Sequence, residues 1–480
     1  MTGFIKNSII LSYVKKFTDF VSEMWNESHF GWLVTRNMGD VKSKNSLFYR
    51  IINYLISGTF SINIAGRIGE KIRESWLLNI LSHYELGVYL LVFLAPIVPT
   101  MICVALVIMT FMSFFINSIV KNKFKIELDA FGFFVILFAL ILFIYSATSY
   151  SAKSSLGVCL IYLVFLCFMF LVVACGTDKK RLKIIIFSFV TSGLIVSLYG
   201  IYQHFFGNNI GHAWVDEEMF SNITVRVYST LENPNVLGEY LLLLIPICGA
   251  MVYNSKRLII KFYYLSVLGS AAVCMLFTQS RGCWLGLILA AIIFAFFVDK
   301  KLVALGIIVI MFAPMVLPES IIQRFSSIGN LGDSSTSYRV NIWLGTLRMV
   351  KDYWWMGIGI GSDAFNSVYP FYNYNAAVAL HSHNLYLQLL VETGVCGMIT
   401  FITSIVVSFK KILVGYIYGR KNVYSLICAA CISGLTGFLL QGMFDHAWYN
   451  LRVFGIFWMI IGIGVASRRC VCEEDNTCNK

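Results

Sequence analysis

Long apolar segments separated by short basic stretches make up most of the chain after residue 85. A helix of about 20 apolar residues crosses the hydrocarbon core of a bilayer, because each residue adds about 1.5 Å. The first such region is expected to be a pair of short helices broken near Pro96 and Pro99. Further segments lie at roughly 126–148, 155–175, 183–204, 234–253, 259–278, 282–298, 302–317, 385–409, 423–444 and 452–467. The pattern predicts an all-α, polytopic membrane bundle of about twelve transmembrane helices over residues 86–467.

Residues 1–85 follow a different pattern, in which short apolar stretches alternate with charges and no run reaches the length of a span. One face of an amphipathic helix is formed by Phe17, Phe20, Val21 and Trp25. We expect this N-terminal extension to lie on the cytoplasmic surface of the membrane. We expect residues 468–480 to form a cytoplasmic tail.

Lysine and arginine residues test the span count, since cytoplasmic loops carry an excess of both. Six basic clusters lie at Lys121–Lys125, Lys179–Lys183, Lys256–Lys261, Lys300–Lys301, Lys410–Lys421 and Arg468–Arg469. They fall at alternate ends of successive segments, so twelve spans with both termini inside place all six in the cytoplasm. The same residues account for the net charge of +12, which therefore does not indicate nucleic-acid binding.

The composition agrees with a membrane protein, since 58% of the residues are hydrophobic and only 13% are charged. Most of the 13 cysteines fall inside apolar runs, where a thiol acts as a small hydrophobic group. The sequence has no HExxH motif, no Walker loop and no aspartate-rich metal motif. This disfavours a nucleotide-driven pump, and we predict neither a metal nor a cofactor.

Two long external loops are predicted, at residues 205–232 and 318–383. In the second, apolar residues follow i, i+3, i+4, i+7 spacing at Val340, Trp343, Leu344, Leu347 and Val350. The spacing predicts an amphipathic helix that begins at Arg339 and lies on the bundle. The three glycines of the following GIGIG stretch permit a tight turn. No strand-and-helix unit surrounds them, so a dinucleotide site is disfavoured.

Three arginines on the external side are candidates for binding a phosphate group. Arg281 lies between two apolar runs, where a guanidinium is costly without a partner and matches phosphate oxygens as a planar fork. It either binds phosphate or extends to lipid head groups. Arg226 precedes Asn233, a predicted helix cap whose helix N-terminus favours an anion. It is either a second phosphate ligand or the partner of Glu232. Arg339 is a weaker third candidate.

A histidine at the start of an apolar helix is the main candidate for catalysis. His383 opens the 385–409 segment, and a neutral imidazole there could remove a proton from a sugar hydroxyl. His381 remains an alternative on chemistry alone. Asp445 and His446, at the end of another external helix, either line the same site or cap an interface.

Glu392 lies nine residues into the helix that follows His383, roughly 13 Å deep by helical rise. A carboxyl group at that depth requires a partner or a proton, and we expect it to be paired within the bundle. An active site on the external face has no supply of nucleotide. An activated, lipid-linked donor is therefore the natural substrate.

These motifs together resemble the O-antigen ligase and polymerase family of bacterial envelope glycan synthesis, over roughly residues 90–467. The most specific motif is the ligase-type spacing filled by His383, Asn384, Gly394 and Gly397. The family's arginine before an NPN segment is matched by Arg226, with Asn233, Pro234 and Asn235. Its Ser-Arg-Gly turn is matched by Ser280, Arg281 and Gly282, and its loop-helix arginine and tryptophan by Arg339 and Trp343.

The resemblance implies a metal-independent glycosyltransferase without a cofactor, in the bacterial inner membrane with its site on the periplasmic face. The donor would be a glycan on undecaprenyl diphosphate, held by arginines, with the histidine as base on an acceptor hydroxyl. The acceptor is lipid A-core in ligases and a second lipid-linked glycan in polymerases. The N-terminal extension of about 85 residues departs from the compact family pattern and leaves the subfamily open.

Two other classes of protein are less favoured. A flippase or transporter for lipid-linked oligosaccharide would carry charged groups along a path at the midplane and show internal pseudo-symmetry. A purely structural membrane scaffold would leave the external arginines and histidine unexplained. Here the chemically informative side chains gather instead at the outer ends of the predicted spans.

Overall fold

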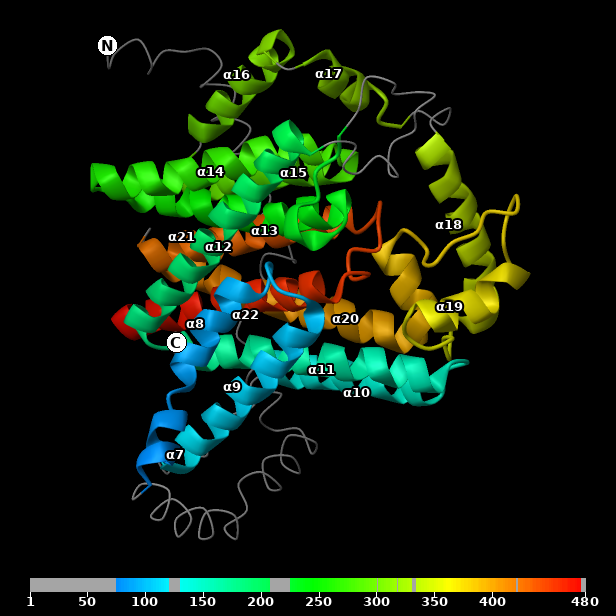
Figure 1. The fold of residues 1–480 in the computed structure, drawn as a ribbon, viewed down its shortest axis with the longest axis horizontal. Coiled ribbons are helices and arrows are strands. Elements are labelled where there is room, and N and C mark those ends of the chain that lie inside the picture. The colour runs from blue at the N-terminus through cyan, green and yellow to red at the C-terminus, as the bar shows by residue number, and fades with distance from the viewer. Residues whose placement is uncertain are drawn as a thin grey trace, which may run out of the picture.

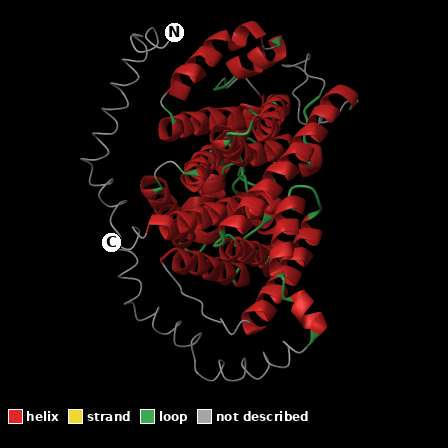
Figure 2. Ribbon diagram, turned by 90° about the vertical axis from the view of Figure 1, so that its left-hand side faces the viewer, coloured by secondary structure: helices red, strands yellow, loops and turns green. Residues whose placement is uncertain are grey.

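The computed structural model describes residues 75–120, 130–207, 225–299, 301–316, 318–329, 334–419 and 422–475. Within these ranges the secondary structure is entirely helical, without a strand (Figure 2). The amphipathic helix predicted around Phe17 and the acidic part of the 205–232 loop lie outside the described residues. The predicted all-α class is confirmed for the part of the chain that can be seen.

Twelve helices of the described chain correspond to the predicted spans. They are α8 (Tyr84–Leu94), α9 (Thr100–Val120), α10 (Ala130–Ala147), α11 (Ala152–Cys175), α12 (Lys179–Phe206), α13 (Pro234–Asn254), α14 (Leu258–Thr278), α15 (Arg281–Val298), α16 (Lys301–Val316), α20 (Leu385–Tyr418), α21 (Val423–Gln441) and α22 (Leu451–Asp475). Nine of them are long and apolar enough to cross a membrane, and α8, α10 and α16 are shorter. The chain is a polytopic helical membrane protein.

The centre of the bundle is formed by α22, α21 and α13, whose apolar stretches are 89%, 78% and 72% buried. Close backbone contact explains part of this packing. A Cβ atom on Gly286 of α15 would lie 2.6 Å from the carbonyl oxygen of Gly437 of α21. Small residues allow this approach, which drives helix association in a membrane through van der Waals contact. By contrast, α14 is only 28% buried and lies at the edge (Figure 1).

The two ends of the bundle differ in character. At one end the basic segments meet, since Tyr424 donates to the carbonyl of Lys179 and the thiol of Cys470 contacts the carbonyl of Gly176. The red α22 runs toward this end, whereas the yellow α18 and α19 lie at the other (Figure 1). The bundle therefore carries its helical cap at the end opposite to the basic clusters.

The cap consists of short helices between α16 and α20. They are α17 (Glu319–Ser326), α18 (Ser334–Tyr353), α19 (Ser362–Val368) and the 3-10 turn η3 (Tyr369–Phe371). Two further short elements occur elsewhere, namely α7 (Trp76–Leu81) and the 3-10 turn η2 (Ser229–Leu231). The predicted helix of the large loop is thus present as α18, although it begins five residues before Arg339.

The face on which α18 packs differs from the predicted one. Its buried residues are Ile342, Gly345, Thr346 and Met349, whereas Leu344 and Leu347 of the predicted apolar stripe are exposed. Ile342 and Met349 join a small core with α19, η3 and Val391 of α20. The reason is that the small Gly345 lets Tyr369 of η3 approach. The buried face of α18 is therefore the one that contacts the other helices of the cap.

The glycine-rich stretch has a clear role in shaping α20. Gly394 interrupts that helix with a φ of 58°, and a Cβ atom there would lie 2.3 Å from the carbonyl oxygen of Trp355. The break frees backbone carbonyls, which accept hydrogen bonds from Ile358 and Gly359 of the GIGIG stretch at 2.9 and 3.0 Å. Non-helical backbone inside a membrane protein requires such internal partners. The stretch therefore pairs with the kinked helix.

Candidate active site

A cavity of 630 Å³ opens between the N-terminal ends of α13, α18 and α20 and the segment that joins α21 to α22. Most of its lining residues are polar, and several of them are predicted site residues. The lining residues used below are Arg226, Asn233, Asn235, Glu239, Tyr338, Arg339, His381, His383, Asp445, His446 and Tyr449. The structure thus brings the candidate base and two of the three candidate phosphate ligands into one cavity.

One wall is the N-terminus of α13. Asn233 caps the helix, as predicted, and accepts a hydrogen bond from the backbone N–H of Asn235 at 2.8 Å. The buried Arg226 donates to the side-chain oxygen of Asn235 at 3.3 Å and to the carbonyl of Thr278 at 3.1 Å. A helix N-terminus and a guanidinium at the same place form a site for an anion.

Several arginines surround this wall. Burial, as the largest cause, and the positive charges of Arg324, Arg339 and Arg281 together lower the pKa of Arg226 to about 9. Arg226 remains protonated at neutral pH, and a cluster of like charges in a cavity attracts an anionic ligand. Arg324, buried in α17, was not predicted from the sequence.

Arg281 lies outside the lining of the cavity. Its guanidinium donates to the carbonyl and the hydroxyl of Ser327, at 3.2 and 2.9 Å. Ser327 follows the C-terminus of α17, where exposed carbonyls favour a cation. Its positive charge still lowers the pKa of Arg226, so Arg281 adds to the positive potential near the cavity without lining it.

The alternative partner considered for Arg226 is occupied elsewhere. Glu232 forms an ion pair with the buried Arg452, with 3.2 Å between nitrogen and oxygen, and Arg452 also donates to the carbonyl of Val98. Glu232 thus has an ion-pair partner other than the one considered from the sequence. Arg452, near the start of α22, instead ties the break between α8 and α9 to the turn before α13.

The opposite wall is the turn that precedes α20. Asn384 caps this helix by accepting hydrogen bonds from the backbone N–H groups of Tyr386 and Leu387, both at 3.0 Å. His383 lies just before the cap with a φ of 48°, a left-handed conformation that a non-glycine residue adopts at a cost. The indole of Trp343 donates to its carbonyl at 3.1 Å. Surrounding bonds thus hold the histidine in an unfavourable conformation.

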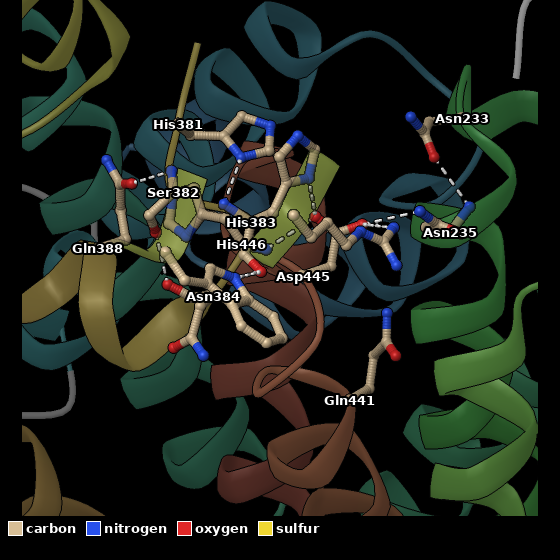
Figure 3. A network of polar contacts seen from close by, with 12 residues as sticks. Asn233, Asn235, His381, Ser382, His383, Asn384, Gln388, Gln441, Asp445 and His446 are labelled. Carbon is tan, nitrogen blue, oxygen red and sulfur yellow. Dashed lines mark hydrogen bonds and ion pairs between the residues drawn. The ribbon is translucent and has the colours of Figure 1, made fainter. Parts of the chain in front are cut away.

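The side chain of His383 is paired with a carboxylate. Its Nδ1 lies 2.9 Å from Oδ1 of Asp445, 62 residues later in the chain (Figure 3). An ionised carboxylate accepts the Nδ1 proton, which leaves the lone pair on Nε2. Nε2 has no partner among the described residues. This is the arrangement of a general base that is oriented by an acid.

Asp445 connects the two walls. Its second oxygen, Oδ2, accepts from the side chain of Asn235 at 2.7 Å and lies 3.6 Å from the guanidinium of Arg339. Burial alone raises the pKa of the Asp445 carboxyl, but His383 and Arg339 outweigh it and hold that pKa well below its usual range. The sequence left Asp445 between a site role and a cap, and the contacts favour the site.

The other two histidines of the cavity are uncharged. Burial and the neighbouring His383 lower the pKa of His381 to about 4, and burial holds the pKa of His446 well below its usual range. Nδ1 of His381 accepts a hydrogen bond from the backbone N–H of His383 at 3.3 Å. His381 therefore supports the turn, whereas His383 has the carboxylate partner.

Glu392 supports the turn that contains His383 through a chain of hydrogen bonds. Its Oε1 accepts from the backbone N–H of Gly361 at 2.9 Å and from the side chain of Gln388 at 2.8 Å. Gln388 in turn accepts from the backbone N–H of Ser382, beside His383, at 2.7 Å. Glu392 is thus paired inside the bundle, as expected. Gly397 lies below the kink, where a Cβ atom would meet the side chain of Thr393.

A metal ion has possible ligands in the same place. Donor atoms of His381, His383 and Asp445 lie within 4.8 Å of one another. The local charge disfavours a cation there, because Arg339 lies 3.6 Å from Asp445 and Arg226 lines the same cavity. An anionic substrate fits the surrounding charge better than a bound cation does.

Two buried polar side chains near the cavity were not singled out from the sequence. Glu239, which is 1% exposed and lines the cavity, lies within an uninterrupted apolar run of α13. Gln441 ends α21 and donates to Oε1 of Glu239 at 3.5 Å. Glutamate at i+4 from Asn235 shares its helix face, and this spacing was the one available hint.

Comparison with protein families gives one match. Residues 264–402 match the O-antigen ligase family model. The match, which covers less than a third of the chain, supports the resemblance indicated by the motifs. It includes His383, Arg339 and Arg281 but ends before Asp445 and begins after Arg226, which the fold brings to the same cavity. No curated protein matches the chain.

Proposed function

We propose that the chain transfers a glycan from undecaprenyl diphosphate to an acceptor hydroxyl on the external face of the bacterial inner membrane. The observation that carries the proposal is the His383–Asp445 pair in a cavity whose opposite wall is cationic. The diphosphate binds at Arg226 and Arg339, with Arg281 and Arg324 adding positive charge from behind. These groups stabilise the charge that develops on the leaving diphosphate.

In this mechanism His383 acts on the acceptor. Nε2 removes the proton of the acceptor hydroxyl as its oxygen attacks the anomeric carbon, and the bond from that carbon to the diphosphate breaks. The imidazolium that forms is stabilised by Asp445 at 2.9 Å. The lipid diphosphate leaves on the α13 wall, so proton and leaving group depart on opposite sides of the cavity.

Both termini are proposed to be cytoplasmic, with residues 86–467 as the transferase domain and the cap of α17 to α19 outside. Transfer by a ligase to lipid A-core is the first candidate, because the family model that matches is that of the O-antigen ligases. A polymerase that joins two lipid-linked glycans would use the same chemistry. A flippase is less favoured, because the arginines gather at one end of the bundle.

Reconstitution in liposomes tests the proposal. The purified protein receives a defined undecaprenyl-diphosphate oligosaccharide, with and without lipid A-core. Glycan on lipid A-core indicates a ligase, and a longer glycan on undecaprenyl indicates a polymerase. Movement of intact donor between leaflets without transfer would contradict the proposal. Transfer should persist in EDTA, and a loss restored by a divalent ion would contradict a metal-independent mechanism.

A further inference from the structure

A buried carboxyl group that the mechanism does not use lies on the cationic wall of the cavity. Glu239 is on α13 one helical turn after Asn235, about 6 Å further into the bundle. Its Oε1 accepts the weak bond from Gln441, and its Oε2 has no partner among the described residues. The residue nevertheless belongs to the lining of the cavity, so this buried carboxyl group lies directly behind the cavity surface.

A second buried acceptor lies beside it. Oε1 of Gln441 also has no partner among the described residues, and Gln441 is only 2% exposed. The close approach of α15 fixes this side chain, because a Cβ atom on Gly282 would lie 2.0 Å from the same oxygen. Buried oxygens without donors are costly, and Glu239 is the member of this pair that belongs to the cavity lining. A ligand that supplies hydrogen-bond donors on the Glu239 side therefore gains from the pair.

The chemistry of the wall selects the kind of donor. A phosphate group cannot donate and would be repelled by a carboxylate, so phosphate belongs at Arg226 and Arg339. An ammonium group would be repelled by the same arginines. A hydroxyl group both donates and accepts, and it therefore pairs with a carboxyl group in either ionisation state.

We infer that Glu239, with Gln441, binds hydroxyl groups of the sugar that is bonded directly to the diphosphate of the donor. The inference rests on the proposed function. The sugar bonded to the diphosphate must lie next to the arginines, and Glu239 is one turn from Asn235, which contacts Arg226. The acceptor lies across Asp445, beside Nε2 of His383.

Binding to purified protein in detergent separates the sugar from the diphosphate. Two probes are used, namely undecaprenyl diphosphate without sugar and the same lipid carrying the oligosaccharide. Glu239→Gln should weaken binding of the glycosylated lipid about tenfold and leave the affinity for the sugar-free lipid within about twofold. Gln441→Met, which removes the second acceptor, should show the same selective loss. Glu319→Gln, at an exposed carboxyl group of α17, is the matched control and should bind both probes as the wild type does.

Equal weakening for both probes would overturn the inference, because it would place Glu239 in the support of the arginines or of the fold. Unchanged binding of both probes, or a change confined to the KM of the acceptor, would overturn it as well. Failure of the proposed function gives a different result, since the wild-type protein would then bind neither probe or would catalyse no transfer.

Discussion

The two helices that form the walls of the cavity begin in the same way and use their first residues differently. Each has an asparagine cap, and the residue before the cap is a non-glycine residue in the left-handed region, with φ of 68° at Glu232 and 48° at His383. Each of these residues pairs with a charged side chain that follows α21 in the chain. Glu232 pairs with Arg452 of α22, and His383 pairs with Asp445 between α21 and α22.

The two pairs differ in whether a side-chain atom remains available to a ligand in the cavity. The Glu232 side chain is 78% exposed. Its partner Arg452 is buried and connects the turn before α13 to the break between α8 and α9. The His383 pair faces the cavity and leaves Nε2 open to a substrate. Backbone strain before a helix cap therefore does not mark a catalytic residue by itself. A catalytic role also requires a partner that orients the side chain and a cavity that the side chain faces.

The largest effect should come from replacing these two residues in parallel. His383→Ala should reduce kcat on the order of 10³-fold, because general base catalysis is lost, with little change in donor affinity. Glu232→Ala is the matched control and should keep transfer within about threefold, because Glu232 and Arg452 lie outside the cavity and Arg452 keeps the carbonyl of Val98 as an acceptor. Initial rates and donor binding in proteoliposomes measure both. Similar losses in the two variants would contradict the distinction between the pairs.

The next effect concerns the cationic wall. Arg226→Lys should raise the KM for the donor between about tenfold and a hundredfold, since a point charge replaces a planar fork with several donors. The kcat at saturating donor should fall less. Arg257→Lys, at the opposite end of α13, serves as control. A loss confined to kcat with an unchanged KM would show that Arg226 does not bind the donor in the ground state.

A smaller effect is expected below the histidine turn. Glu392→Leu removes the acceptor for Gly361 and Gln388 and should lower kcat about fivefold through displacement of His383. Glu392→Gln keeps an oxygen for both donors and should remain close to the wild type. The ratio of the two rates is the measurement. An equal, large loss in both variants would indicate that a titrating carboxyl group is required there.

The smallest effect is the dependence of donor binding on alkaline pH. The pKa of Arg226 is lowered to about 9, so its charge is lost as the pH rises through that region and the diphosphate binds less well. The phosphates are already ionised above pH of about 8 and do not contribute to the change. Affinity for undecaprenyl diphosphate should fall severalfold between pH 8 and 10. In Arg226→Gln this fall should be absent, and its persistence there would assign it to another group.

Much of the fold follows from hydropathy and from the basic clusters. The break at Pro96 and Pro99, the cap at Asn233 and the position of His383 at the end of the bundle opposite to those clusters are each local features of the sequence. The packed face of α18 was predicted wrongly, because the apolar stripe of Leu344 and Leu347 says only that one face is apolar. It does not say which surface the helix meets.

The candidate site could be predicted only in part, for a related reason. Motifs indicated His383 and the arginines, but the pairing of His383 with Asp445 joins segments 62 residues apart. Membrane helices are apolar on all faces, so periodicity does not reveal which side of α13 carries Glu239 into the cavity. Spacing along one helix can be derived from sequence, whereas contacts between distant helices required the packed structure.

The pairing of His383 with Asp445 is the central claim, and a double-mutant cycle on kcat tests it most directly. His383→Ala, Asp445→Asn and the double variant are compared with the wild type under saturating donor. If Asp445 acts by orienting His383, the double variant is no slower than His383→Ala, within about threefold. If the two losses multiply instead, Asp445 acts independently of His383, and the pair is not the catalytic base.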